Sequence, residues 1–181
     1  ALTRYYLDAG VGGLAVGVHT TQFAIREPKH GLLRPVLELA AETVREHEEK
    51  TGRRIVRVAG VCGQTDDAIR DAKLARELDY DLGLLNLSAF PDAEDAVLLA
   101  HARRIAEIIP LFGFYLQPDS GGRLLSQEFF REFAAIPNLI AVKMAAFDRE
   151  LTQEAIEGIE DSGRGDEMIL YTGNDNFIIE D

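Results

Sequence analysis

The stretch that decides the fold is Leu139-Ile140-Ala141-Val142-Lys143-Met144-Ala145-Ala146. It is apolar except for one lysine, Lys143. The turn signal Ile136-Pro137-Asn138 precedes the run, and an acidic segment begins at Asp148. This pattern predicts a β-strand buried on both faces. Burial lowers the pKa of a lysine, and the free amine is the nucleophile that a Schiff-base enzyme needs. The alternative is that Lys143 extends to the rim of the sheet or pairs with Asp148.

Apolar runs of the same kind recur along the chain and alternate with segments of helical periodicity. The predicted strands are residues 13–18, 54–63, 81–90, 111–116, 139–146 and 168–172. The predicted helices are residues 1–10, 35–52, 66–78, 92–109, 126–135 and 151–159. Such alternation is typical of an α/β fold in which helices cover a parallel sheet.

Two architectures fit this alternation, the doubly wound open sheet and the closed (β/α)8 TIM barrel. No glycine-rich phosphate-binding motif follows any predicted strand, which favours the barrel over a nucleotide-binding sheet. A complete barrel needs about 250 residues. The 181 residues are therefore predicted to form one barrel domain, residues 1–181, that is incomplete at both ends and covers about strands 2 to 7.

Composition limits the classes of partner. The formal net charge is −12, with 19 Lys and Arg against 31 Asp and Glu, so binding to nucleic acid or to an anionic membrane is not expected. No signal peptide and no apolar run of about 18 residues is present, which predicts no membrane span. The single cysteine, Cys62, excludes an internal disulfide and suits a reducing, cytoplasmic setting.

Several stretches resemble the dihydrodipicolinate synthase and N-acetylneuraminate lyase family, the pyruvate-type class I aldolases built on a (β/α)8 barrel. The most specific are Tyr115-Leu116-Gln117-Pro118, the run from Pro137 to Lys143, and Gly173-Asn174-Asp175. The resemblance implies that Lys143 forms a Schiff base with a small carbonyl substrate and that Tyr115 relays protons to it. It also implies a homo-oligomer, a tetramer or a dimer, and requires no cofactor. No metal-ligand spacing such as His-x-x-x-His appears, so a metal site is not expected.

The chain departs from the family where the substrate carboxylate should bind. The family's Gly-Thr-Thr-Gly-Glu loop corresponds to Val18-His19-Thr20-Thr21-Gln22, so His19, Thr20 and Thr21 are the predicted substrate-binding residues there. The family's asparagine after the tyrosine is replaced by Leu116, and its arginine has no counterpart until Arg123. Phe90 stands where some members carry a tyrosine. A weaker carboxylate clamp predicts poor binding of pyruvate and a ligand that is bulkier or less charged.

The sequence thus predicts a Schiff-base-forming lyase of the aldolase or synthase type. The altered loop and the lost asparagine leave one alternative, a barrel of the same family that binds a small molecule or a partner without turnover.

Overall fold

A computed structural model describes residues 1–18 and 23–176 of the chain. The strands are β1 (Gly13–Val16), β2 (Val56–Val61), β3 (Leu82–Leu85), β4 (Leu111–Leu116), β5 (Leu139–Ala145) and β6 (Ile169–Thr172). The helices are α1 (Leu2–Asp8), α2 (Leu33–Thr51), α3 (Thr65–Glu77), α4 (Asp95–Ala106), α5 (Gln127–Ala134) and α6 (Arg149–Asp161). Short 3-10 turns lie at Phe23–Arg26, Pro118–Ser120 and Gly165–Glu167.

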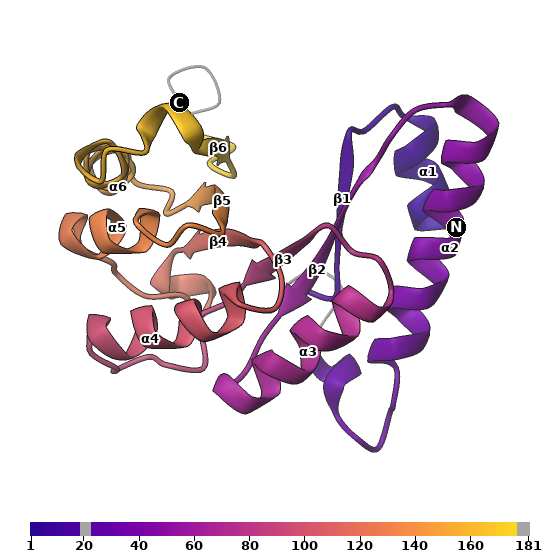
Figure 1. Cartoon of the computed structure of the whole chain (residues 1–181), viewed down its shortest axis with the longest axis horizontal. Coiled ribbons are helices and arrows are strands. Elements are labelled where there is room, and N and C mark those ends of the chain that lie inside the picture. The colour runs from indigo at the N-terminus through magenta and orange to yellow at the C-terminus, as the bar shows by residue number, and fades with distance from the viewer. Residues whose placement is uncertain (19–22, 177–181) are drawn as a thin grey trace.

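The strands form one parallel, six-stranded sheet in the order β1-β2-β3-β4-β5-β6. Each strand therefore lies beside its neighbours in sequence, as in a barrel wall. Figure 1 shows the strands in chain order, from β1 beside α1 and α2 to β6 beside α6, with the helices along the outside. The predicted α/β class with six parallel strands is confirmed. The described residues form a half-barrel in which β1 and β6 are edges, not the closed eight-stranded barrel.

Two sets of apolar side chains cover the two faces of the sheet. The larger core lies between the sheet and the helices and includes Leu85, Leu98, Ile105, Leu111, Phe129, Phe133, Leu139 and Val142. A smaller cluster lies on the inner, concave face and contains Val18, Val58, Cys62, Leu84, Phe114, Leu116 and Ala145. Because successive strand residues point to opposite faces, membership of these clusters tells which side each residue faces.

Some predicted boundaries were too wide. The strand predicted at residues 81–90 is only Leu82–Leu85, and the helix predicted at residues 92–109 is Asp95–Ala106. The side chain of Asn86 accepts a hydrogen bond from the Ser88 amide at 2.8 Å, a local turn contact that competes with strand pairing. Pro91 cannot donate to a ladder, so the loop continues until α4.

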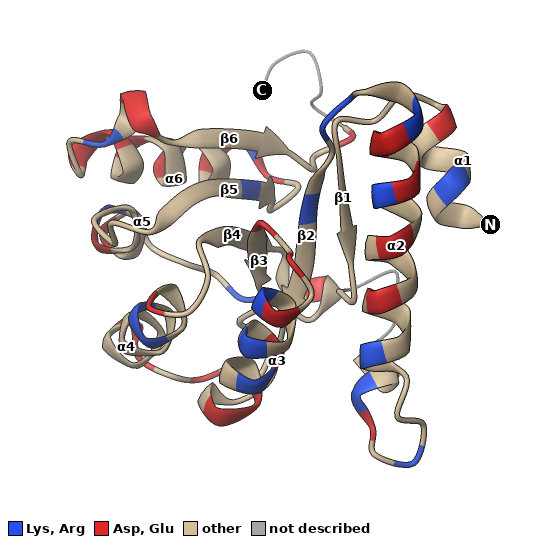
Figure 2. Ribbon diagram, turned by 45° about the vertical axis from the view of Figure 1, so that its right-hand side comes forward, with Lys and Arg blue, Asp and Glu red and all other residues tan. Residues whose placement is uncertain are grey.

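Charged residues lie mainly on the helices and loops, whereas the strands are almost free of them (Figure 2). Arg57 in β2 and Lys143 in β5 are the two charged residues within the six strands. In the described part of the chain, no helix combines the length and apolar character needed to cross a membrane.

Candidate active site

Lys143 lies on the inner face of the half-barrel, near the carboxyl end of β5. It is the parallel partner of Phe114 in β4, and its Nζ is 5.0 Å from the centre of the Phe114 ring. Burial lowers the pKa of the Lys143 ammonium below its ordinary value. Within residues 1–18 and 23–176, no carboxylate lies within 4.0 Å of this nitrogen, so the ammonium has only the ring to stabilise it.

Gly173 leaves the space that the Lys143 side chain occupies. A Cβ atom at residue 173 would lie 2.6 Å from Cε of Lys143 and 3.0 Å from the carbonyl oxygen of Met144. The Gly173 amide also donates a hydrogen bond to that carbonyl. The glycine therefore allows the chain after β6 to approach β5 directly beside the lysine.

Asp148 does not pair with Lys143, which was the alternative considered for the lysine. Asp148 is the N-cap of α6, and its Oδ1 accepts a hydrogen bond from the Leu151 amide at 3.0 Å. A carboxylate in this position satisfies one of the free amide groups of the first turn and interacts favourably with the helix dipole. Its role in the structure is to begin α6.

Tyr115 is not brought to Lys143, and the predicted geometry of this pair is wrong. Tyr115 faces the helices: its ring centre lies 5.0 Å from that of Phe130, and its hydroxyl oxygen accepts a long hydrogen bond of 3.5 Å from the Leu125 amide. Its parallel partner is Met144, which belongs to the same helix-side core. Tyr115 and Lys143 therefore point to opposite faces of the sheet.

A register shift between β4 and β5 causes this separation. Leu111 pairs with Leu139, but Phe112 pairs with Ala141, so Ile140 is an extra residue on β5. Uninterrupted pairing from the first pair would have placed Tyr115 opposite Lys143. One added residue turns every later side chain of a strand to the other face relative to its neighbour.

Arg123, a predicted substrate-binding residue, bonds the backbone of the loop between β3 and α4. Its Nη1 donates to the carbonyl oxygens of Phe90 and Ala93, at 2.8 and 2.7 Å. Phe90 is also away from the expected mouth, because its ring packs on His101 of α4, with the ring centres 4.7 Å apart. Leu116, which replaces the family's asparagine, does lie on the inner face, in the apolar cluster there.

His19, Thr20 and Thr21, the remaining predicted substrate-binding residues, lie outside the described residues. His101 belongs to the helix-side layer, where its Nδ1 lies 2.9 Å from the Thr65 hydroxyl oxygen. Burial lowers the pKa of His101 to about 4, so its ring is neutral at pH 7. Among the described residues, no three His, Cys, Asp or Glu side chains form a group that could hold a metal ion.

Tyr171 is a strand neighbour of Lys143 that the sequence did not predict. It is the parallel partner of Lys143 in β6, and it therefore shares the inner face with the lysine. Its ring lies 5.2 Å from that of Phe112, and half of the residue is exposed. The pair Ala141 and Ile169 fixes the register that places Tyr171 beside Lys143. The sequence alone does not give the register between β5 and β6.

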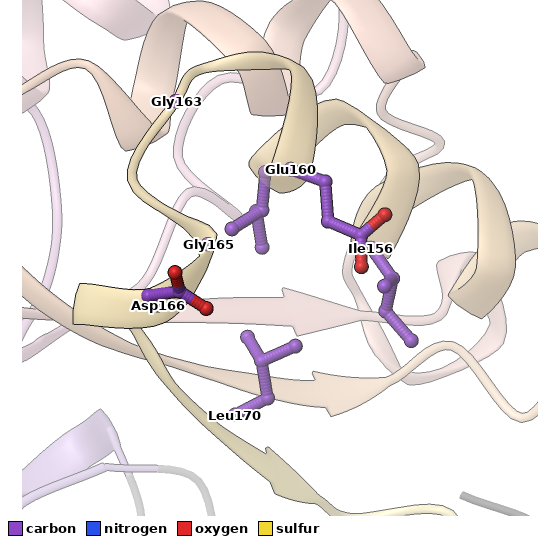
Figure 3. A pocket seen from close by; sticks show the side chains of 7 residues that line it. Ile156, Glu160, Gly163, Gly165, Asp166 and Leu170 are labelled. Atoms are coloured by element: carbon purple, nitrogen blue, oxygen red, sulfur yellow. The ribbon is translucent and has the colours of Figure 1, made fainter.

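One hollow lies on the inner face of the sheet and another on the helix side. The inner one has a volume of about 670 Å³ and is lined mainly by residues from the first halves of the strands, among them Val58, Leu82, Phe112, Ala141, Ile169 and Tyr171. The second hollow, about 430 Å³, lies between α6 and β6 and is lined by Ile156, Ile159, Glu160, Gly163, Gly165, Asp166 and Leu170 (Figure 3). Because Leu170 pairs with Val142 of the helix-side core, this second hollow is on the face opposite to Lys143.

Comparison with known proteins gives a consistent set of relatives. A curated 4-hydroxy-tetrahydrodipicolinate synthase from Methanoculleus marisnigri is 27% identical over 151 residues, which are 78% of this chain and 50% of that protein. The structure of the Acinetobacter baumannii dihydrodipicolinate synthase, complexed with pyruvate, is 23% identical, with a TM-score of 0.77 over 97% of this chain and 56% of that one. The structure of the Thermotoga maritima dihydrodipicolinate synthase is 21% identical, with a TM-score of 0.77 over 97% of this chain and 57% of that one. No protein-family model matches the chain.

The chain is similar in sequence to a curated 4-hydroxy-tetrahydrodipicolinate synthase and in fold to several dihydrodipicolinate synthases. The resemblance deduced from the sequence is thereby confirmed, and the half-barrel is the part of the family fold that this chain represents. The chain spans about half the length of the curated relative that it matches.

Proposed function

We propose that this chain carries the imine-forming lysine of a class I aldolase-type lyase, and that Lys143 is that lysine. The single observation that carries the proposal is the environment of its amine, which lies on the inner face of the sheet beside Phe114 and has no carboxylate partner among the described residues. Active sites of barrel enzymes lie at the carboxyl ends of the strands, and Lys143 is close to that end of β5.

The chemistry requires a free amine. The Lys143 nitrogen adds to the carbonyl carbon of a small keto acid or related compound and forms a carbinolamine, which loses water to give the imine. Because burial lowers the pKa of Lys143, a larger fraction of the amine is unprotonated near neutral pH than in an exposed lysine. The resulting iminium accepts the electron pair of a neighbouring carbon–carbon or carbon–hydrogen bond as that bond breaks and becomes an enamine. Where water is lost, the enamine electrons expel a protonated hydroxyl group from the next carbon.

The lining of the inner face favours a ligand less charged or bulkier than pyruvate. The inner face next to Lys143 carries an apolar cluster that includes Phe114, Leu116 and Ala145. Arg123 uses its guanidinium on two backbone carbonyls, which reduces its value as a carboxylate clamp. His19, Thr20 and Thr21 remain proposed substrate-binding residues of the loop after β1.

The remaining expectations form part of the same proposal. Residues 1–181 would be one part of a single (β/α)8 barrel domain, and the lyase would be a homo-oligomer, a tetramer or a dimer. Light scattering at micromolar protein concentration tests the oligomer, and a monomer would contradict it.

Borohydride trapping tests the function directly. The purified protein is incubated with pyruvate, with phenylpyruvate and with simple aldehydes, reduced with borohydride, and digested for peptide mass mapping. A reduced adduct is expected on Lys143, absent in Lys143→Ala and retained in Lys73→Ala, which removes an exposed lysine of α3. An adduct that survives Lys143→Ala contradicts the proposal.

The second candidate is a barrel that binds small molecules without turnover. The observation that favours it is the position of Tyr115, whose hydroxyl faces Leu125 on the helix side instead of the amine. Ligand binding that is unchanged in Lys143→Ala, with no adduct and no turnover in any variant, would support this candidate and reject the lyase.

A further inference from the structure

The chain that leaves β1 crosses over β2 at Gly60. A Cβ atom at residue 60 would lie 2.3 Å from the carbonyl oxygen of Gly17 and 2.7 Å from Cβ of Val18. Gly17 has a φ angle of 79°, in the left-handed region that favours glycine. Val18 then joins the apolar cluster on the inner face. The two glycines therefore allow the loop after β1 to enter the inner face directly over β2.

Two side chains take the place of β1 beyond its end. The ladder between β1 and β2 stops at Ala59, so the next backbone groups of β2 on that side have no strand partner. The Gly60 carbonyl oxygen accepts a hydrogen bond of 3.0 Å from Nη2 of Arg26, and the Cys62 amide donates one of 3.2 Å to Oδ2 of Asp71. Buried backbone groups need such partners. Arg26 and Asp71 therefore complete the hydrogen bonding of β2 at its carboxyl end.

Arg26 and Asp71 also form a buried ion pair. Nε of Arg26 donates to Oδ2 of Asp71 at 2.6 Å, and the exposed fractions of the two side chains are 17% and 9%. Burial raises the pKa of the Asp71 carboxyl, and the Arg26 guanidinium opposes that effect. A buried pair is screened little by salt, and removing one partner leaves a costly unpaired charge. The pair therefore holds the 3-10 turn Phe23–Arg26 against α3.

Both ends of the loop after β1 are thus fixed at one residue, Gly60. Gly17 and Val18 lie against its α-carbon, and Arg26 binds its carbonyl oxygen. A loop that is already held at both ends loses less conformational freedom when a ligand binds to it, which favours binding.

We propose that Arg26 and Asp71 are positioning residues for substrate binding. They hold the loop after β1 at the inner face, and this loop carries the proposed substrate-binding residues His19, Thr20 and Thr21. The inference rests on the proposed function, in which the loop binds the substrate of Lys143. Because the pair acts through the loop and not on the amine, its loss should weaken substrate binding and leave the imine-forming step intact.

The test replaces both members of the pair. Arg26→Met alone or Asp71→Leu alone leaves a buried charge without its partner and should lower the unfolding free energy, whereas the double variant should recover much of that loss. The double variant still lacks the groups that bond Gly60 and Cys62. Its pyruvate concentration for half-maximal trapping on Lys143 should rise roughly 10-fold or more, while the trapping rate at saturation stays nearly unchanged.

Arg34 and Glu77 supply a matched control. They form an exposed ion pair that joins α2 to α3, with bonds of 2.8 and 2.7 Å. Arg34→Met combined with Glu77→Leu should change neither the half-saturating concentration nor the rate.

Amide hydrogen exchange adds a measurement that needs no ligand. Exchange of residues 17–26 should become faster in the double variant of Arg26 and Asp71, with the rest of the chain unchanged.

Each outcome separates this inference from the proposed function. A double variant of Arg26 and Asp71 that keeps the half-saturating concentration of the unaltered protein overturns the positioning role and leaves the lyase intact. Weaker binding together with faster exchange over the whole chain indicates general loosening and also overturns it. No adduct on Lys143 in the unaltered protein overturns the imine chemistry, and the role of the pair in substrate binding falls with it.

Discussion

The Lys143 ammonium lies 5.0 Å from the centre of the Phe114 ring, and the two residues are partners in the pairing of β5 with β4. The face of an aromatic ring attracts a cation, so this contact offsets part of the cost of removing the ammonium from water. Burial lowers the pKa of Lys143, whereas the ring favours the charged form and acts in the opposite direction. The balance between these two effects sets the fraction of free amine.

Phe114→Leu should therefore lower the pKa of Lys143 further. A cation–π contact contributes about 0.5–2 kcal/mol, and one pKa unit corresponds to about 1.4 kcal/mol, so a shift of about 0.4–1.4 units is expected. The measurement is the pH midpoint of the trapping rate. Phe133→Leu removes a buried ring from the helix side and serves as the control. A midpoint that moves equally in both variants, or upward in Phe114→Leu, would contradict the contact.

Lys143→Met should change how stability depends on pH. The pKa of Lys143 is lower in the folded protein than in the unfolded chain, where it is about 10.4, so the unfolded state binds more protons between the two values. In that window the stability of the unaltered protein rises with pH relative to the variant. Urea unfolding at intervals from pH 7 to 10.5 measures the difference. A difference in unfolding free energy that is constant over this range would show that burial does not affect the lysine.

Much of the fold could be predicted because short apolar strands alternate with amphipathic helices. The strand Leu111–Leu116 has the predicted bounds, and the strand predicted at 139–146 ends one residue earlier, at Ala145. The segment after β3 was predicted less well, because a strand pattern continues where Asn86 and Pro91 form a loop. Turn contacts by single polar side chains leave little trace in the pattern of apolar residues.

The site was predicted only in part. Lys143 could be proposed because the lysine interrupts an apolar strand and because the run from Pro137 to Lys143 resembles the family. Its partners could not, because they depend on strand register, and the extra residue Ile140 reverses the face on which Tyr115 lies. Sequence spacing predicts which residues share a face within one strand, but a bulge between two strands changes the relation between them.

Gly173→Ala should impair the lysine. The new Cβ would lie 2.6 Å from Cε of Lys143, so the side chain must move away from its present position. Displacing a reacting group by about 1 Å can cost roughly 100-fold in rate, and a loss of roughly 10- to 100-fold in the trapping rate is expected. Gly165→Ala is the matched control, because its Cβ would meet no atom closer than 3.5 Å. Equal rates in the two variants would mean that Gly173 does not position Lys143.

Asp148 should affect helix stability and not the amine. Asp148→Ala removes the N-cap of α6 and should lower the unfolding free energy by about 1 kcal/mol, whereas Asp148→Asn keeps a capping oxygen and should cost only a few tenths. Urea unfolding measures both changes. Neither variant should move the pH midpoint of trapping at Lys143. A lower midpoint in Asp148→Asn would reveal an ion pair, because loss of a nearby carboxylate lowers the pKa of a lysine.

Arg123 gives the sharpest test of how the substrate carboxylate is bound. Its Nη1 joins the loops after β3 and β4 through the carbonyl oxygens of Phe90 and Ala93. Arg123→Met removes both charge-assisted bonds, and a loss of about 2–4 kcal/mol in unfolding free energy is expected.

The measured quantity is the ligand concentration that gives half-maximal trapping on Lys143. If the guanidinium only joins the two loops, Arg123→Met should raise this concentration by the same factor for pyruvate and for methyl pyruvate. Methyl pyruvate has the same reacting carbonyl but no negative charge, so the pair isolates the contribution of the carboxylate. A loss for pyruvate at least 10-fold greater than for the ester, which corresponds to about 1.4 kcal/mol, would show that Arg123 binds the carboxylate as the sequence predicts.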